Sequence, residues 1–233
     1  MGSSRLPGKV LMPVNGYPLL GYLLDRLGRV SAPHRVVVAT TTRSEDDVIA
    51  EFCAARSVLV HRGSPDDVLD RYRAAAERVD ADLVARITAD CPLIDPHIVD
   101  RVIATAARGD CDYASNSLER TFPRGLDVEV FTRRSLDEAA AEAREPYERE
   151  HVTPFIYRRP ERYRLCNVAN DRMEGDERWT VDTPEDLALV SHIIEALAPT
   201  SPEFGLADVR ALLDRHPDWR SLNAHIEQKP LGA

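Results

Sequence analysis

The sequence is poor in cysteine and has no long apolar run, and each shortage excludes a class of protein. Only four of its 233 residues are cysteine, they lie far apart, and none forms a C-x-x-C pair. A disulfide framework is therefore excluded, and reduced thiols in a cytoplasmic protein are expected. No apolar run approaches the roughly 18 residues that a membrane span requires. The amino-terminal residues also lack the apolar stretch of a signal peptide.

Positive charge is also scarce. The 30 lysines and arginines are outnumbered by 39 aspartates and glutamates, which gives a formal net charge of −9 at pH 7. Because a nucleic-acid backbone is bound by a basic surface, nucleic acid is excluded as a partner. With 43% apolar and 30% charged residues the chain is typical of a globular protein. Its length predicts one main domain over residues 1–200, with a helical tail over 201–233 packed on it.

Predicted strands and helices alternate along almost the whole chain. Strand patterns mark residues 34–40, 58–61, 82–88, 113–116, 126–131, 163–168 and 178–181, and of these 34–40 and 82–88 are typical of buried strands. Helical periodicity or a helix-start signal marks residues 18–27, 44–56, 96–108, 134–144, 147–159 and 183–197, and the segments that begin at 64 and 206. Residues 2–18 are expected to form a loop.

This alternation predicts an α/β fold with a mostly parallel, mixed central sheet and helices on both faces. In such sheets ligands bind beyond the carboxyl ends of the strands. The candidate functional residues are therefore sought in the segments that directly follow strands.

The segment GSSRLPGK (2–9) has the composition of an anion-binding loop. Small residues let backbone N–H groups approach an anion, and Arg5 and Lys9 supply positive charge. It is not a Walker loop, because Val10 stands where a Mg²⁺-binding Ser or Thr is required. Taken alone, the segment could equally be a solvated terminus.

Two further segments place a single carboxylate just beyond a predicted strand. Asp90 follows the strand 82–88 within TADCPLIDP, and Asp182 follows the strand 178–181 within RWTVDTPEDL. Taken alone, each is explained by a turn or by a helix cap. Together with the cationic loop they make a Mg²⁺–nucleotide site, since Mg²⁺ takes one or two carboxylates and completes its shell with phosphate oxygens and water.

These segments resemble the nucleotidyltransferases with a glycosyltransferase-A-like, nucleotide-diphospho-sugar transferase-like fold. The sequence is most similar to the cytidylyltransferase family of the spore coat polysaccharide biosynthesis protein F type, homologues of Kdo (3-deoxy-manno-octulosonate) cytidylyltransferase. The similarity covers most of residues 1–190 in order. It rests on GSSRLPGKVL, VVVATT, RGSPDDVLDRY, RITADCPLIDP, RTFPRGLDVEVF, PYEREHVTPFIY and RWTVDTPEDL.

The resemblance implies transfer of CMP from CTP to a sugar, usually an ulosonic-type sugar acid, with release of pyrophosphate, for surface polysaccharide or glycoconjugate biosynthesis. It implies that the triphosphate is held by Ser3, Ser4, Arg5 and Lys9, and Mg²⁺ by Asp90 and Asp182. Near the base and ribose it implies Thr40, Asp67, Arg71 and Thr88. In the sugar pocket it implies Arg124, Asp127, Glu129, Glu150 and His151. Related enzymes also suggest a homodimer.

Two other functions stay open from the sequence: a same-fold nucleotidyltransferase that uses another nucleotide and a sugar 1-phosphate, or an inactive nucleotide-binding scaffold. One departure from the family pattern carries a further expectation. The family has a β-strand and an arginine just upstream of the GSSRLPGK loop, where Met1 stands in this chain. We expect the sheet to lack its first strand, this form to be unstable or inactive, and an upstream segment of about eight residues to restore it.

Overall fold

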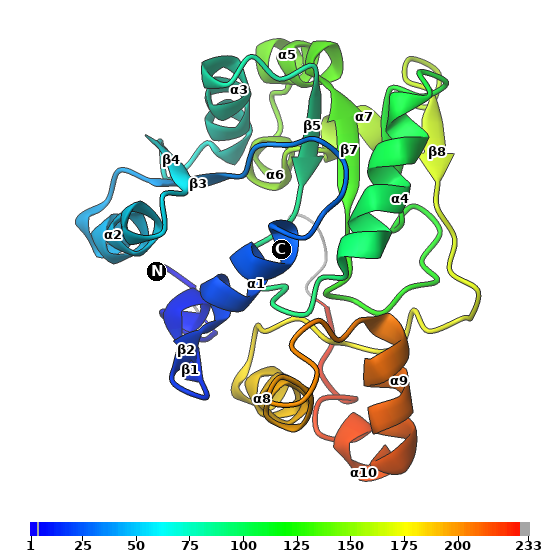
Figure 1. Ribbon diagram of the computed structural model, residues 1–233. Coiled ribbons are helices and arrows are strands. Elements are labelled where there is room, and N and C mark those ends of the chain that lie inside the picture. The colour runs from blue at the N-terminus through cyan, green and yellow to red at the C-terminus, as the bar shows by residue number, and fades with distance from the viewer. Residues whose placement is uncertain (4, 229–233) are drawn as a thin grey trace.

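The computed structural model describes residues 1–3 and 5–228, and it confirms the α/β class (Figure 1). Its main sheet has four strands in the order β5 (Leu83–Arg86), β7 (Glu129–Thr132), β6 (Tyr113–Ser115) and β8 (Leu165–Asn167). This sheet is mixed because β7 runs antiparallel to both of its neighbours, whereas β6 and β8 are parallel. A separate parallel pair is formed by β3 (Val37–Thr41) and β4 (Leu59–Gly63).

Helices follow the strands along the chain and cover both faces of the main sheet (Figure 1). They are α1 (Leu19–Leu27), α2 (Asp47–Ala55), α3 (Val68–Arg78), α4 (Pro96–Ala107), α5 (Arg133–Glu142), α6 (Pro146–His151), α7 (Pro154–Tyr157), α8 (Pro184–Leu197), α9 (Leu206–Arg215) and α10 (Pro217–Arg220). The short 3-10 helices η1 (Lys9–Leu11) and η2 (Ser44–Asp46) complete the set. None of the helices in the described part of the chain is long and apolar enough to cross a membrane.

Alternating residues of β7 divide the interior into two cores, because successive side chains of a strand point to opposite faces. Val130 belongs to the core that includes α4, α8 and α9. Phe131 belongs to the core formed with residues of α3, α5 and α7, where it stacks on Tyr113. The tail packs on the main domain through contacts between α8 and α9.

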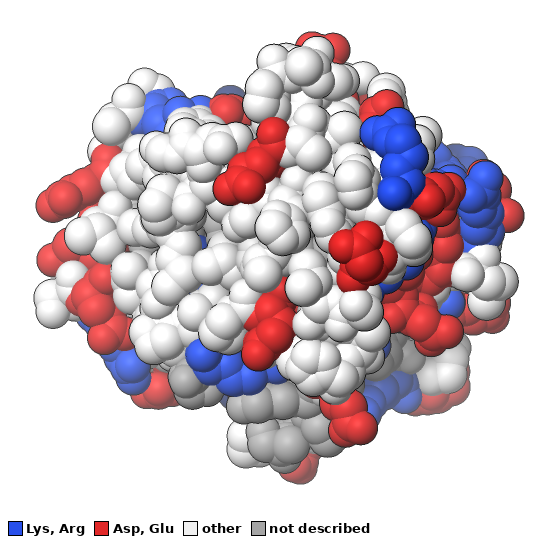
Figure 2. All heavy atoms as spheres, turned by 90° about the horizontal axis from the view of Figure 1, so that it is seen from below, with Lys and Arg blue, Asp and Glu red and all other residues white. Residues whose placement is uncertain are grey.

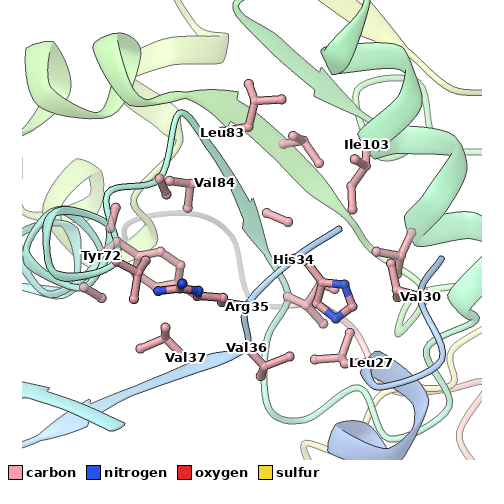
Figure 3. Close-up of a pocket in the computed structure, with 18 of the residues that line it drawn as sticks. Leu27, Val30, His34, Arg35, Val36, Val37, Tyr72, Leu83, Val84 and Ile103 are labelled. Carbon is pink, nitrogen blue, oxygen red and sulfur yellow. The ribbon is translucent and has the colours of Figure 1, made fainter. Parts of the chain in front are cut away.

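An apolar channel of about 690 Å³ separates β3 from β5 (Figure 3). Its walls include Val37 of β3, Tyr72 of α3 and Ile103 of α4. The consecutive residues 83–85 of β5 also line it. Because successive side chains of a strand point to opposite faces, three consecutive lining residues indicate that β5 presents its edge to the channel. Among the described residues, β3 pairs only with β4 and β5 only with β7. The sheet is therefore interrupted at this channel.

Three details differ from the sequence-based expectations. Residues 2–18 are not all loop, because β1 (Pro13–Val14) and β2 (Tyr17–Pro18) form a hairpin around Asn15 and Gly16, both of which have positive φ. The Asn-Gly pair is the usual signal for such a turn. The helix expected from residue 64 begins at Val68, since the Asp67 side chain caps it.

The strand expected over 178–181 is also wrong. In this segment only Arg178 makes a β-bridge, and its partner is Arg124. The segment is held by contacts with two loops instead of by a strand ladder, and these contacts matter for the site described below.

The surface agrees with the acidic composition. On the face shown in Figure 2, which looks at the molecule from below the view of Figure 1, lysine and arginine side chains of the described residues are scattered among acidic ones. They form no continuous basic area on that face.

Candidate active site

The structure brings Lys9, Asp90 and Asp182 together. The Lys9 Nζ lies 2.8 Å from Asp90 Oδ2 and 2.6 Å from Asp182 Oδ1. Lys9 opens η1, Asp90 comes shortly after β5, and Asp182 directly precedes the N-cap of α8. Two carboxylates that are far apart in the sequence therefore share one ammonium group.

Backbone contacts fix the two acidic segments side by side. The Val181 N–H donates to the Asp90 carbonyl at 2.9 Å, and the Thr180 hydroxyl donates to the same oxygen at 3.0 Å. Thr88, one of the residues expected near the nucleotide, donates its hydroxyl to Asp90 Oδ1. The Asp90 carboxylate is thus oriented from its own loop, and the segment that carries Asp182 is attached to it.

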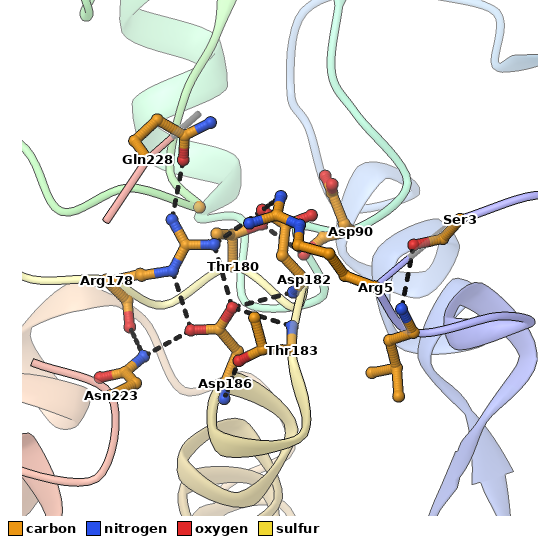
Figure 4. A network of polar contacts seen from close by, with 12 residues as sticks. Ser3, Arg5, Asp90, Arg178, Thr180, Asp182, Thr183, Asp186, Asn223 and Gln228 are labelled. Carbon is orange, nitrogen blue, oxygen red and sulfur yellow. Dashed lines mark hydrogen bonds and ion pairs between the residues drawn. The ribbon is translucent and has the colours of Figure 1, made fainter. Parts of the chain in front are cut away.

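The amino-terminal loop adds a second cation. Arg5 Nη2 lies 2.9 Å from Asp182 Oδ2, on the other oxygen from the one that binds Lys9 (Figure 4). The Ser3 hydroxyl accepts a hydrogen bond from the Leu6 N–H and shapes the loop. Gly8, at φ +72°, lets the chain turn into η1. Ser4, the remaining predicted phosphate ligand, lies outside the described residues.

Ion pairing keeps the central groups charged. Burial alone lowers the pKa of the Lys9 ammonium, but Asp90 and Asp182 more than reverse this and raise it above the ordinary lysine value. Burial likewise raises the pKa of the Asp182 carboxyl, but Lys9, Arg178 and Arg5 hold it below the ordinary aspartate value. At neutral pH the site therefore holds the Lys9 cation paired with an ionised Asp182.

The donor set fits a hard divalent cation that arrives with phosphate. Among the described residues no group of three or more His, Cys, Asp or Glu side chains forms a metal cage. Mg²⁺ does not need one, because it binds one or two carboxylates and takes its other ligands from phosphate and water. Asp90 and Asp182 would supply the carboxylate oxygens, while Lys9 and Arg5 would face the phosphates.

The loop that contains Arg124 and Asp127 lies against the segment that precedes Asp182. The Arg124 carbonyl accepts from the Trp179 N–H at 2.7 Å. The next residue, Gly125, has φ +101°. A Cβ at this position would stand 2.6 Å from the backbone nitrogen of Thr180, so only glycine fits. This close contact places two of the predicted sugar-binding residues beside the acidic pair.

The surroundings of Arg124 favour an anion. Burial lowers the pKa of its guanidinium, and the neighbouring Arg120 and Arg178 lower it further. Asp127, by contrast, is paired with Arg120 at 2.6 Å. Arg178 is likewise paired with Asp182 and Asp186, whereas Arg124 forms no ion pair among the described residues, so its guanidinium is the one that a ligand carboxylate would find without a protein partner.

Of the other predicted sugar-binding residues, Glu129 is the most deeply placed. Its Oε1 accepts hydrogen bonds from the hydroxyls of Tyr113 and Thr153, each at 2.6 Å, and its Oε2 pairs with Arg86. Because both carboxylate oxygens of Glu129 already have partners in the protein, Glu129 orients these neighbours and has no unpaired oxygen for a ligand.

The two remaining sugar-binding candidates lie at the end of α6, where Glu150 is exposed and His151 is half-buried. Val152 follows at φ +72°, a strained conformation for a β-branched residue, and the Thr153 N–H closes a γ-turn on the His151 carbonyl at 2.8 Å. The turn is joined to Glu129 through the Thr153 hydroxyl, and the role of Glu150 and His151 in a sugar pocket stays a prediction.

The residues expected near the base and ribose form two braced loops. The Thr40 hydroxyl, at the end of β3, donates to Asp46 at 2.8 Å. Asp67 caps α3 through the Asp70 N–H at 2.9 Å and also accepts from Arg149. Both loops lie at the carboxyl ends of the β3–β4 pair, the edge where ligands bind in α/β sheets.

Arg71, the last of the nucleotide candidates, folds back over its own loop. Its guanidinium donates to the carbonyl of Ser64, and its stem packs against Gly63, where any side chain would meet the Arg71 Cγ at 2.6 Å. Its Nε is buried and has no hydrogen-bond partner among the described residues. A ligand in this loop would have that N–H available to it.

The sequence interpretation missed Arg178 and Asp186. Each lies four positions from Asp182 in the chain, and Arg178 Nη2 donates to Asp182 Oδ2 at 2.7 Å. Asp186 is the second half of the capping box that begins α8 at Thr183. The T-x-x-D pattern is readable in the sequence, whereas the contact with Arg178 depends on the fold.

The fold and the acidic pair beside a cationic loop define an α/β protein of the nucleotide-diphospho-sugar transferase type. Comparison with known proteins agrees. A family model described as cytidylyltransferase matches residues 1–210. Spore coat polysaccharide biosynthesis protein SpsF of Bacillus subtilis is 33% identical over 226 residues, which is 94% of this chain and 92% of that protein.

Solved structures show the same relationship. A cytidylyltransferase from Leptospira borgpetersenii superposes with a TM-score of 0.89 at 34% identity, covering 99% of this chain and 95% of that one. A CMP:2-keto-3-deoxy-manno-octonic acid synthetase complexed with CTP superposes with a TM-score of 0.62 at 20% identity, covering 84% and 95%, and shares the fold. The chain belongs to the cytidylyltransferase family.

Proposed function

We propose that this protein transfers CMP from CTP to a hydroxyl of an ulosonic-type sugar acid and releases pyrophosphate, in a Mg²⁺-dependent reaction that serves surface polysaccharide or glycoconjugate synthesis. The observation that carries the proposal is the Lys9 ammonium held between Asp90 and Asp182 beside the cationic loop. Membership of the family supports the choice of CTP, and a neighbour of the same fold is described as complexed with CTP.

The reaction is an in-line displacement at the α-phosphorus. The sugar hydroxyl oxygen forms a new bond to phosphorus, the bond to the β-phosphate oxygen breaks, and the hydroxyl proton passes to solvent. When bound by Asp90 and Asp182, Mg²⁺ would neutralise phosphate charge. Lys9 and Arg5 bind the phosphates and stabilise the charge that develops on the leaving pyrophosphate, so catalysis rests on positioning and electrostatics.

The acceptor is assigned from Arg124. This half-buried guanidinium lies next to the segment that carries Asp182 and forms no ion pair among the described residues, which suits the carboxylate of a sugar acid. A sugar 1-phosphate could also bind a cation there, so a second nucleotidyltransferase reaction is an outcome of the test. Four free thiols and a nucleotide substrate support a cytoplasmic location, and the homodimer implied by the family resemblance stays a prediction.

The test is a pyrophosphate-release assay with CTP, UTP, GTP and ATP, each offered with ulosonic acids or with sugar 1-phosphates. We expect release only with CTP and a sugar acid. Asp90→Asn and Asp182→Asn should each reduce turnover about a hundredfold or more. The exposed Asp110, which pairs only with Arg108 on the surface, provides the matched control Asp110→Asn with unchanged turnover.

Two results contradict the proposal. Release with another nucleotide and a sugar 1-phosphate would assign the same-fold alternative reaction. Binding of CTP with Mg²⁺ in calorimetry, without turnover of any acceptor, would indicate a nucleotide-binding scaffold. If either aspartate variant keeps most of its rate at ordinary Mg²⁺ concentration, the metal assignment is wrong.

A further inference from the structure

Beneath the acidic pair, Asp182 is held by a buried ion pair between Arg178 and Asp186 (Figure 4). Arg178 donates through Nη2 to Asp182 Oδ2 at 2.7 Å and through Nε to Asp186 Oδ1 at 2.8 Å. Arg178 is 6% exposed and Asp186 is completely buried. Arg178 shares Oδ2 of Asp182 with Arg5, while the Lys9 ammonium binds Oδ1, so the Arg178 contact helps to fix the orientation of the carboxylate toward the phosphate loop.

The same ion pair fixes the backbone that carries Asp182. Asp186 Oδ2 accepts from the N–H of Asp182 at 3.0 Å and from the N–H of Thr183 at 3.2 Å. Both the side chain and the main chain of Asp182 are thus positioned by one buried carboxylate and its arginine. A buried ion pair keeps its geometry only when its remaining polar atoms are satisfied.

The carboxy-terminal tail supplies the missing hydrogen bonds. The Asn223 amide donates through Nδ2 to Asp186 Oδ1 and to the Arg178 carbonyl, each at 2.8 Å, and Asn223 is 3% exposed. The Gln228 side-chain carbonyl accepts from Arg178 Nη1 at 2.8 Å. Both residues follow residue 210, where the match to the family model ends.

We propose that the tail completes the active site, with Asn223 as a positioning residue for Asp182 that acts through Asp186 and Arg178. Asn223 touches none of the groups assigned to the nucleotide or the sugar. Without its two donated hydrogen bonds, Asp186 and the Arg178 carbonyl lose a buried partner, and the arginine is no longer held in the orientation that aims Asp182. The inference rests on the proposed role of Asp182 in binding Mg²⁺.

The experiment titrates Mg²⁺ into the full chain saturated with CTP and follows binding by calorimetry. Asn223→Ala should weaken Mg²⁺ binding about tenfold, the size usual for groups that orient a metal ligand. Gln228→Ala, at an exposed position, should weaken it less and in the same direction. The matched control is His225→Asn, exposed and in the same tail, which should bind as the parent does.

A double-mutant cycle distinguishes positioning from general destabilisation. If Asn223 acts through Asp182, adding Asn223→Ala to Asp182→Asn should cause no further loss of Mg²⁺ binding. The same addition should lower the melting temperature of Asp182→Asn by as much as Asn223→Ala lowers that of the parent. Additive losses of binding would overturn the inference. So would a parent-like affinity in both Asn223→Ala and Gln228→Ala.

The outcomes also separate this inference from the proposed function. If Asp182→Asn binds Mg²⁺ as the parent does, or if the parent binds neither CTP nor Mg²⁺, the proposed function fails and the tail inference fails with it. If Asp182→Asn loses binding while the tail variants keep it, only the tail inference is wrong. Circular dichroism of each variant confirms that the protein tested is folded.

Discussion

We predict that a strand inserted into the apolar channel between β3 and β5 would stabilise the protein. The two long walls of this channel are strand edges without a further partner among the described residues, and its lining is mostly apolar. The Met1 ammonium pairs with Asp46, which also binds Thr41 at the end of β3. A segment joined to Met1 would therefore enter the channel from the carboxyl end of β3.

We expect an extension of about six apolar, β-branched residues, joined before Met1 by a short polar spacer, to insert as a strand. Five inserted residues would match the five of β3. Burial contributes about 2 kcal/mol per side chain, ladder hydrogen bonds about 0.5 kcal/mol per residue, and ordering costs about 1.5 kcal/mol per residue. The net gain is about 5 kcal/mol, or about 10–20 °C in melting temperature for a chain of this size.

The assay is thermal unfolding followed by circular dichroism, combined with amide hydrogen exchange of β3 and β5. The control is an extension of equal length made of Ser, Gly and Lys, which cannot fill an apolar channel. The inserted strand should slow exchange at Val37–Thr41 and Leu83–Arg86, whereas the polar extension should leave both unchanged. Equal melting temperatures and equal exchange for the two extensions would refute the reasoning.

Two other predictions concern charge and backbone. The folded-state pKa of Asp182 lies below the ordinary aspartate value of about 3.9, so its ionised form contributes stability that is complete above about pH 5 and is lost as the pH falls through the folded-state pKa. The melting-temperature gap between the parent and Asp182→Asn should therefore shrink between about pH 5 and pH 3, and a constant gap would contradict the ion pairing. Gly125→Ala should cost about 3 kcal/mol in urea unfolding, because its Cβ would clash with the Thr180 backbone at a positive φ. Gly109→Ala, also at positive φ but in open space, should cost only about 1 kcal/mol, and equal losses would show that the close contact is unimportant.

The order of strands and helices could be predicted from local patterns. Local strand patterns predicted β3 to β8 to within a few residues. Pro96 and the Thr183 capping box mark the starts of α4 and α8. The direction of β7 could not be predicted, because periodicity says that a segment is a strand but not which neighbour it pairs with. The 13–18 hairpin had a local signal, Asn15-Gly16, which the loop-rich composition around it obscured.

The site was partly predictable for the same reason. Placement after predicted strand ends pointed to Asp90 and Asp182, although the strand predicted before Asp182 does not form, and composition pointed to Lys9. Arg178 and Asn223 could not be found in this way, since each is defined by a partner that only the fold provides. The segment around Arg178 also resembles a strand in its composition, although backbone contacts with Arg124 and Asp90 hold it in an irregular conformation.

The shared ammonium of Lys9 has a thermodynamic consequence. A divalent ion alone would have to displace a cation that both carboxylates already neutralise, so its affinity for the free protein should be low. A bound triphosphate offers the lysine another partner and so frees the carboxylates for the metal. The nucleotide therefore raises the affinity for the divalent ion, and the ion raises the affinity for the nucleotide by the same factor. The free protein thus carries its own counter-ion, and exchange of that internal cation for an external one is coupled to the arrival of the nucleotide.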